Sequence, residues 1–193
     1  MNLFRKIRKL IKNRSGAALV EFTLVSPLLF ITTFGILEFS NVMWQYQQAD
    51  IATRLAVRLA ATRDSVVTGL PDCGVATSEP AGTDCADVSG SDSWSVSCNA
   101  GSPGGSCNAA TIARIMTEIH KVNPNIPASN VQIEYSGAGL GFVGLGRPVP
   151  IVTVRVTNLT ANYIAIGNLV GFANSFTMPD FVASIPAEDL TGT

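Results

Sequence analysis

Apolar residues dominate one stretch near the start of the chain, from residue 17 to about residue 44. Glu21 and Glu38 are the only charged residues within it. A helix of about 20 apolar residues is roughly 30 Å long, which is the thickness of one bilayer core. Trp44 and Tyr46 follow, as in the aromatic belt at a membrane surface. The pattern predicts a transmembrane helix over residues 17–44.

A cleaved secretory signal peptide is the alternative for such a stretch. It requires small residues in an Ala-x-Ala-like pattern directly after the apolar core. The residues that follow here, GILEFSNVMWQYQQ, contain no such pattern, so we expect the helix to remain as an anchor. Pro27 lies inside the span, where neighbouring helices accommodate the kink that a proline introduces.

Helical periodicity continues after the apolar stretch. Asp50 precedes Arg54 by four residues, the favourable order for an ion pair on one helix. Neither Gly nor Pro occurs between Ile36 and Val67. We therefore expect an amphipathic extension over residues 45–67. The helical periodicity is clear as far as Arg63, which gives one helix of about 45 residues.

Small residues form a stripe along this extension at helical spacing. The stripe consists of Ala49, Ala52, Ala56 and Ala60. It allows close approach of another element, either the remainder of this chain or a neighbouring subunit. The two interpretations are compatible, and we expect partner subunits to meet the helix there.

Residues 68–107 are rich in Gly, Ser, Pro and Asp and show no periodicity, which indicates a loop stabilised by cross-links. The four cysteines all lie in it: Cys73, Cys85, Cys98 and Cys107. They form no CxxC pair, and the chain has a single histidine, so a zinc site is disfavoured. An even number of cysteines outside the cytoplasm favours two disulfides. Three pairings are possible, and we favour Cys73–Cys85 with Cys98–Cys107 because each closes a short loop.

Acidic residues in this loop, Asp84, Asp87 and Asp92, raise the question of calcium binding. Their spacing is not that of an EF-hand, so we expect a solvated acidic loop.

The last region, residues 108–193, begins with a helix signal. Asn108 suits the N-cap of a helix that extends to about residue 122. Four apolar residues lie on one face of that helix: Ile112, Ile115, Met116 and Ile119.

Strand signals come next. Val and Ile alternate with polar residues over 131–135 and 148–157, joined by a glycine-rich connection that is too long for a tight turn. Residues 174–176 and 181–185 are candidates for a third strand, which prolines restrict to a sheet edge. The whole chain is thus expected to be α+β, with a long N-terminal transmembrane helix extended outside the membrane, a second helix, a small antiparallel β-sheet and a disulfide-stapled loop.

Charge is distributed unevenly along the chain. Of the 13 Lys and Arg residues, 6 lie in residues 1–16, and no acidic residue precedes Glu21. The remainder has 7 cations and 14 acids, a net charge of −7. The positive-inside rule places the basic leader in the cytoplasm and the last domain in the periplasm. The anionic remainder argues against nucleic-acid binding.

A glycine and a glutamate mark the start of the span. In KNRSGAALVEF, Gly16 directly precedes the apolar stretch and Glu21 follows five residues later. A simple anchor needs neither residue, and an unpaired carboxylate inside a membrane costs a few kcal/mol. The alternative is that Gly16 only begins a helix and that Glu21 reaches the interface. Glu38, at the outer end, is expected to be a solvated acid.

The segment GAALVEFTLVSPLLFITTFGILEFSNVMWQYQQADIATRLAVRLAA resembles the TadE-like proteins of tight-adherence (Tad, or Flp) pilus systems. In that family an apolar helix opens with a Gly-Ala-Ala-x-Val-Glu-Phe motif, followed by a Pro, a Gly-x-x-Glu and an Ala/Arg-rich end. The matching residues are Gly16, Glu21, Phe22, Pro27, Gly35, Glu38 and Arg58. The resemblance covers about residues 15–61.

The resemblance implies a minor pseudopilin with a pilin-like fold in the inner membrane. A prepilin peptidase would cleave it between Gly16 and Ala17, and Glu21 and Phe22 would serve recognition and assembly. Its partners would be other pilin or pseudopilin subunits and the Tad assembly-platform proteins. Ala at residue 17 and Phe22 after Glu21 favour the Flp/Tad class over type II secretion pseudopilins.

Two other classes of protein remain as alternatives. One is an unprocessed bitopic membrane protein with an extracytoplasmic adhesion or binding domain. The other is a membrane-anchored enzyme, which we do not expect, because His120 stands alone and no Gly-x-Ser-x-Gly motif occurs. The sequence indicates no cofactor and no metal.

Overall fold

A computed structural model of the chain describes residues 16–70, 79–88, 94–144, 149–163, 175–188 and 190. These residues form an α+β fold with two α-helices and antiparallel strands, as predicted. The chain divides into two compact units: Met1–Val42 with Asn162–Ser175, and Met43–Ala161 with Phe176–Thr193. The basic leader before Gly16 lies outside the described residues.

Helix α2, Ala17–Thr62, is one continuous helix of 46 residues and includes Pro27. Its length is about 69 Å. Hydroxyl groups in its apolar part donate to carbonyls of the same helix, for example Thr23 Oγ1 to Leu19 O (2.7 Å) and Thr33 Oγ1 to Leu29 O (2.7 Å). These bonds satisfy polar atoms that an apolar environment would otherwise leave unpaired.

Helix α2 ends at Thr62, rather than at residue 67 as the predicted extension does. Hydrogen bonds from distant residues to the last carbonyls of α2 replace those of a further helical turn. The Tyr135 hydroxyl donates to Ala60 O (2.6 Å), and the Glu188 N–H donates to Ala61 O (3.0 Å). Both bonds satisfy carbonyls that a helix leaves free at its C-terminus.

Four strands form the main sheet, in the order β1-β2-β3-β6, with every neighbouring pair antiparallel. Their bounds are Ser95–Asn99 (β1), Val131–Ser136 (β2), Ile151–Val156 (β3) and Phe181–Pro186 (β6). Strands β2 and β3 and the edge position of β6 confirm the prediction.

Strand β1 corrects the prediction that residues 68–107 are entirely loop. It is rich in serine, with apolar positions only at Val96 and Cys98. It forms because β2 pairs with it at five consecutive positions and because Cys98 is buried there.

The register of the strands sorts side chains onto two faces. One cross-strand row consists of Cys98, Ile133, Val154 and Ala183, and the next consists of Val96, Tyr135, Val152 and Ile185. The opposite face has a polar row of Ser97, Glu134, Thr153 and Ser184. One apolar and one polar face are typical of an antiparallel sheet that is covered on one side.

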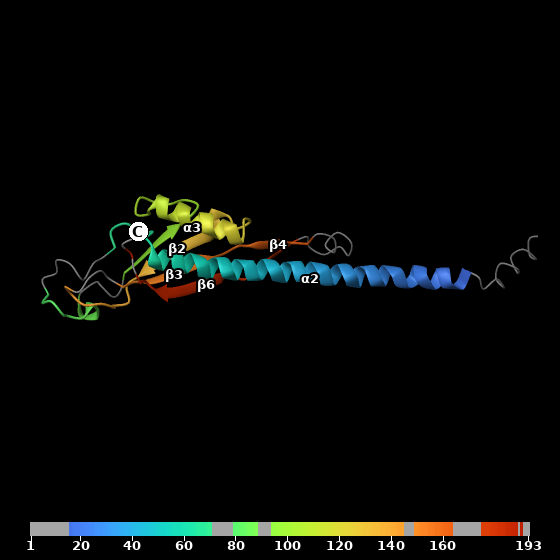
Figure 1. Cartoon of the computed structure of the whole chain (residues 1–193), viewed down its shortest axis with the longest axis horizontal. Coiled ribbons are helices and arrows are strands. Elements are labelled where there is room, and N and C mark those ends of the chain that lie inside the picture. The colour runs from blue at the N-terminus through green and yellow to red at the C-terminus, as the bar shows by residue number, and fades with distance from the viewer. Residues whose placement is uncertain are drawn as a thin grey trace, which may run out of the picture. The chain divides into compact units, whose positions relative to one another are not determined.

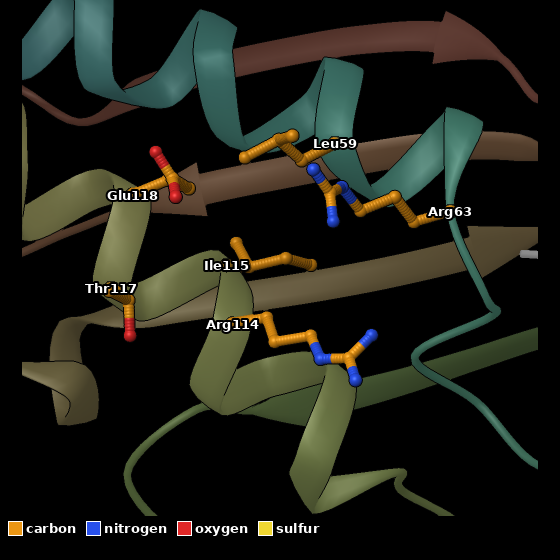
Figure 2. Close-up of a pocket in the computed structure, with 6 residues that line it drawn as sticks. All are labelled: Leu59, Arg63, Arg114, Ile115, Thr117 and Glu118. Atoms are coloured by element: carbon orange, nitrogen blue, oxygen red, sulfur yellow. The ribbon is translucent and has the colours of Figure 1, made fainter. Parts of the chain in front are cut away.

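Two helices cover the apolar face. Helix α3, Ala109–Val122, begins at Asn108, whose Oδ1 accepts from Ala110 N–H (3.1 Å) and Thr111 N–H (3.3 Å), so the predicted cap is confirmed. Its four predicted core residues are buried. The final turns of α2 and helix α3 lie together on the same side of the strands (Figures 1 and 2).

The alanine stripe of α2 belongs to this core. Ala49, Ala52, Ala56 and Ala60 are all 0% exposed. The intramolecular interpretation of the stripe is therefore correct, and the expectation that partner subunits meet it is wrong. Small residues occur there because a helix that lies close on its own sheet has no space for larger ones.

The glycine-rich connection after β2 packs against the cysteine loop. Gly82 N–H donates to Val143 O (2.8 Å), Val143 N–H donates to Thr83 O (2.9 Å), and Cys85 N–H donates to Gly141 O (3.0 Å). A Cβ at Gly139, where φ is +65°, would lie 2.9 Å from the Ala86 Cα. The glycines therefore permit the two backbones to approach.

The remaining elements are short. They are the 3-10 turns η2 (Cys85–Asp87) and η3 (Ala128–Asn130) and the strands β4 (Thr160–Asn162) and β5 (Ser175–Thr177), which form a separate two-stranded sheet. The strand predicted near residues 174–176 thus pairs outside the main sheet.

Candidate functional site on helix α2

The first half of α2 exposes apolar side chains around its whole circumference. The exposed ones are Leu19, Val20, Phe22, Leu24, Val25, Leu28, Leu29, Phe30, Ile31, Phe34, Ile36, Leu37 and Phe39. A soluble monomer does not keep such a large contiguous apolar patch in water. Among the described residues, α2 is the one helix long and apolar enough to cross a membrane. It is therefore a candidate single span.

Gly16 and Ala17 lie at the exposed beginning of this helix. Ala17 is the first α-helical residue, and Gly16 directly precedes it. A Cβ built at Gly16 would meet nothing within 4 Å. The described structure therefore does not require a glycine at this position for packing.

Glu21 and Phe22 lie one helical turn further on. Ala17 and Glu21 are four residues apart, about 6 Å along the axis. Glu21 is exposed and makes no ion pair or hydrogen bond within the described part of the chain. Phe22 is 67% exposed. The four predicted site residues thus form one accessible segment with a single carboxylate.

Glu38 differs from its prediction. We expected a solvated acid, but its side chain is 7% exposed. A residue on an isolated helix cannot be buried by its own helix alone. Other parts of the chain must cover it, and the local pattern around Gly35 and Glu38 does not indicate them.

The second half of α2 keeps one accessible face. Met43, Trp44 and Ile51 are exposed there, and Arg54 Nε lies 2.9 Å from Asp50 Oδ2, which confirms the predicted i,i+4 ion pair. The Tyr46 ring packs on the buried Phe181 ring, with centroids 4.9 Å apart. Tyr46 therefore anchors the helix to β6.

Disulfide bonds follow the predicted pattern where the structure describes them. Cys98 and Cys107 are joined, with an S–S distance of 2.03 Å. Cys85 is also disulfide-bonded, and no described cysteine is a free thiol. Cys73, its predicted partner, lies outside the described residues.

The Cys98–Cys107 disulfide lies where three elements meet. Val67 and Cys107 form an antiparallel bridge, Asn108 N–H donates to Val66 O (2.7 Å), and Cys98 lies in β1. The residues after α2, strand β1 and the beginning of α3 are therefore held together at one point.

Tyr135 completes this junction, and sequence reasoning assigned it no role beyond its strand. Its hydroxyl donates to Ala60 O and accepts from Val66 N–H (3.3 Å). Burial raises the pKa of Tyr135 to about 12, against the opposing effect of hydrogen bonds from Val66 and Ser65. The neutral phenol thus acts as a structural cap.

A small cavity lies between α2 and α3. Its volume is about 150 Å³, and Leu59, Arg63, Arg114, Ile115, Thr117 and Glu118 line it (Figure 2). Sequence reasoning did not identify it, because its two arginines come from helices that are distant in the sequence.

His120 has a structural partner. Its Nε2 lies 3.0 Å from Ile126 O, which ties the end of α3 to the following turn. Within the described residues there is no group of three or more His, Cys, Asp or Glu side chains able to hold a metal ion.

Comparisons with known proteins bear on α2 alone. The family model described as TadE-like protein matches residues 16–58. The match begins at the glycine before the span and ends at Arg58, so it excludes the sheet. Searches of curated proteins and of solved structures found no match. Residues 16–58 are therefore a TadE-like segment, as the motif from Gly16 to Arg58 predicted, and this segment indicates a protein associated with a Tad pilus.

Proposed function

We propose that this chain is a pseudopilin-like structural or assembly subunit of a Tad/Flp-type pilus, which a prepilin peptidase cleaves between Gly16 and Ala17. One observation supports this most strongly. The first half of the TadE-like segment is exposed on all sides, and its beginning has an accessible glycine and a carboxylate that no described residue pairs.

The chain would cross the inner membrane once. The basic leader favours a cytoplasmic N-terminus, and the sheet domain would then be periplasmic. Disulfides persist in oxidising compartments, so the Cys98–Cys107 bond supports this orientation.

Cleavage would change the electrostatics of the helix start. Hydrolysis adds one water across the Gly16–Ala17 peptide bond, which leaves a carboxylate on Gly16 and an amine on Ala17. It removes the six leader cations. The new amine of one subunit would neutralise Glu21 of a neighbour, because an unpaired carboxylate in a membrane is costly.

The partners would meet the exposed span. Lipid is as apolar as leucine, so helices associate in a membrane through close packing and polar contacts. Glu21 is the polar group available for such a contact. The partners would be other pilin-like subunits and the Tad assembly platform.

Intact-mass analysis of the chain extracted from membranes tests the processing step. We expect a mature chain that begins at Ala17. Gly16→Val should keep the leader, because a bulkier residue then precedes the scissile bond, and Leu24→Val serves as the matched control further along the helix. A wild-type chain that still begins at Met1 would contradict the proposal and favour the unprocessed adhesion or binding protein.

Substitution of Glu21 tests the assembly step. Glu21→Ala makes the span more apolar, so membrane insertion should not suffer. Incorporation into complexes with other pilus components should fall about tenfold, the effect of losing about 1.4 kcal/mol. Glu21→Asp keeps the charge and is the control. Equal co-fractionation of Glu21→Ala and wild type would remove the assembly role of Glu21.

A further inference from the structure

The cavity between α2 and α3 combines an apolar floor with positive charge. Leu59 and Ile115 supply the apolar part. Arg63, which directly follows α2, and Arg114 in α3 also line it (Figure 2). Glu118 also lines it, but its Oε1 is paired with Lys121 Nζ at 2.7 Å. The local charge is therefore positive.

Neither arginine has a polar partner among the described residues. Arg63 and Arg114 make no ion pair or hydrogen bond in the described part of the chain. Guanidinium groups beside an apolar surface bind carboxylates well, because their planar donors match the two carboxylate oxygens. The cavity thus favours a ligand with an apolar group next to a carboxylate.

The opposite chemistry occurs on another surface of the same domain. Residues 79–88 and 139–144 are joined by backbone hydrogen bonds, and we call these two segments the tip. Asp84 and Phe142 form an antiparallel bridge in the tip. Directly opposite residues in such a pair point to the same side, with Cβ atoms about 5 Å apart.

Both side chains of this pair are accessible. Phe142 is 49% exposed, and Asp84 is exposed beside it. The surrounding charge is negative, because residues 64–113 contain 6 acids and no Lys or Arg. The tip therefore presents a phenyl ring next to a carboxylate in an acidic setting.

We propose that the cavity of one copy binds the tip of a second copy, with Phe142 on Leu59 and Ile115 and with Asp84 on Arg63 and Arg114. The size is suitable, since the volume of about 150 Å³ is of the order needed for one aromatic ring. The charges are complementary, and the contact would remove apolar surface of Phe142 and Leu59 from water.

The contact joins two different surfaces and is therefore heterologous. Such contacts propagate from copy to copy instead of closing into a symmetric dimer. The proposal is independent of cleavage at Gly16, because cavity and tip both consist of residues that follow the apolar first half of α2.

Photocrosslinking of the full chain tests the proposal. Phe142 is replaced by p-benzoylphenylalanine in one tagged copy, which is co-expressed with a second copy that has a different tag. We expect adducts to residues 59–63 and 114–118 of the second copy. The same photoreactive residue at Val182, which is 50% exposed on the other face of the sheet, is the control and should give no such adducts.

Charge substitutions sharpen the test. Arg63→Glu with Arg114→Glu in the second copy should lower the adduct yield about tenfold, as loss of paired charges at an interface does. Arg155→Glu, an exposed arginine in β3, should leave the yield unchanged. Asp84→Asn in the first copy should also lower it, while its Oδ1 still accepts from Ala86 N–H.

Several outcomes would overturn the proposal. Adducts confined to the same chain, to lipid or to another protein would show that the tip has a different contact. An unchanged yield in the double arginine variant would remove the cavity from the contact. An intact Cys98–Cys107 disulfide and an unchanged unfolding temperature establish that each variant is folded, and intact mass shows whether processing at Gly16 is unaffected.

Discussion

The two halves of helix α2 have opposite relations to the rest of the chain. Before Val42, every large apolar side chain of α2 is exposed, and only Glu38 is buried. After Met43, alanines at 0% exposure alternate with exposed polar residues, and the helix packs on a sheet. One continuous helix thus has one half with exposed apolar side chains and one half that packs on its own domain.

The difference shows what each pattern of residues requires. Large apolar residues all around a helix indicate a surrounding apolar phase or other helices, and those of the first half of α2 are exposed in the described structure. A narrow stripe of small residues indicates one close neighbour. The TadE-like segment, residues 16–58, spans both halves, so it combines an exposed apolar surface with a folding element.

Matched phenylalanines provide the strongest test of this comparison. Phe181 is buried against Tyr46, so Phe181→Ala should lower the free energy of unfolding of the sheet domain by about 3–5 kcal/mol. Phe22→Ala in the exposed half should change it by less than about 0.5 kcal/mol. Urea unfolding of the full chain in detergent, followed by circular dichroism, measures both. Similar losses would show that the two halves are not distinct.

The disulfide provides the next test. Replacing Cys98 and Cys107 by Ala should lower the stability of the sheet domain by about 3 kcal/mol in the chain-entropy model, because the bond restricts the unfolded chain. Membrane extraction of the chain should not change, since the exposed half of α2 does not depend on this bond. Ser102→Ala in the same loop is the control, and an equal effect of the control would contradict the assignment.

One substitution made in both halves tests the alanine stripe. Ala56→Leu adds volume where the helix lies on the sheet and should cost about 1–3 kcal/mol of domain stability. Ala18→Leu introduces the same side chain at an exposed position and should cost less than about 0.5 kcal/mol. If Ala56→Leu is as stable as Ala18→Leu, the stripe does not pack as closely as its burial indicates.

The smallest expected effect is the loss of stability at alkaline pH. It tests the Tyr135 hydroxyl at the C-terminal end of α2. The pKa of Tyr135 is raised from 10.0 to about 12 in the folded chain, so the folded state holds this proton more tightly. The stabilisation is complete below pH 10 and is lost as the pH rises through 12. At pH 11 the loss is about 1.4 kcal/mol. The difference in unfolding free energy between wild type and Tyr135→Phe should become smaller from pH 9 to pH 11. A constant difference would contradict a raised pKa of Tyr135 in the folded chain.

Local patterns were sufficient to predict the elements that form through their own side chains. The apolar run predicted α2, the Asn108 side chain predicted the start of α3, and the alternation at Val152, Val154 and Val156 predicted β3. The candidate site at Gly16 and Glu21 was identified in the same way, because its residues lie close together in the sequence, in consecutive turns at the beginning of one helix.

Features created by distant partners were not predictable. Strand β1 depends on pairing with β2, since its serines have weak strand preference. The burial of Glu38 and the direction of the alanine stripe depend on which segments fold back onto α2. The cavity at Arg63 and Arg114 depends on how α2 and α3 pack together, and the spacing of residues along the sequence does not predict this packing.

The cap on α2 has a consequence for the order of events during synthesis. The carbonyl of Ala60 accepts a hydrogen bond from the Tyr135 hydroxyl, and Ala60 leaves the ribosome 75 residues before Tyr135. At about 5 to 20 residues per second, this interval lasts about 4 to 15 s. In the proposed orientation, the apolar half of α2 has time to enter the membrane while the alanine stripe still lacks its sheet. The chain would be translocated unfolded, and the stripe would then first meet the strands that cover it in the periplasm.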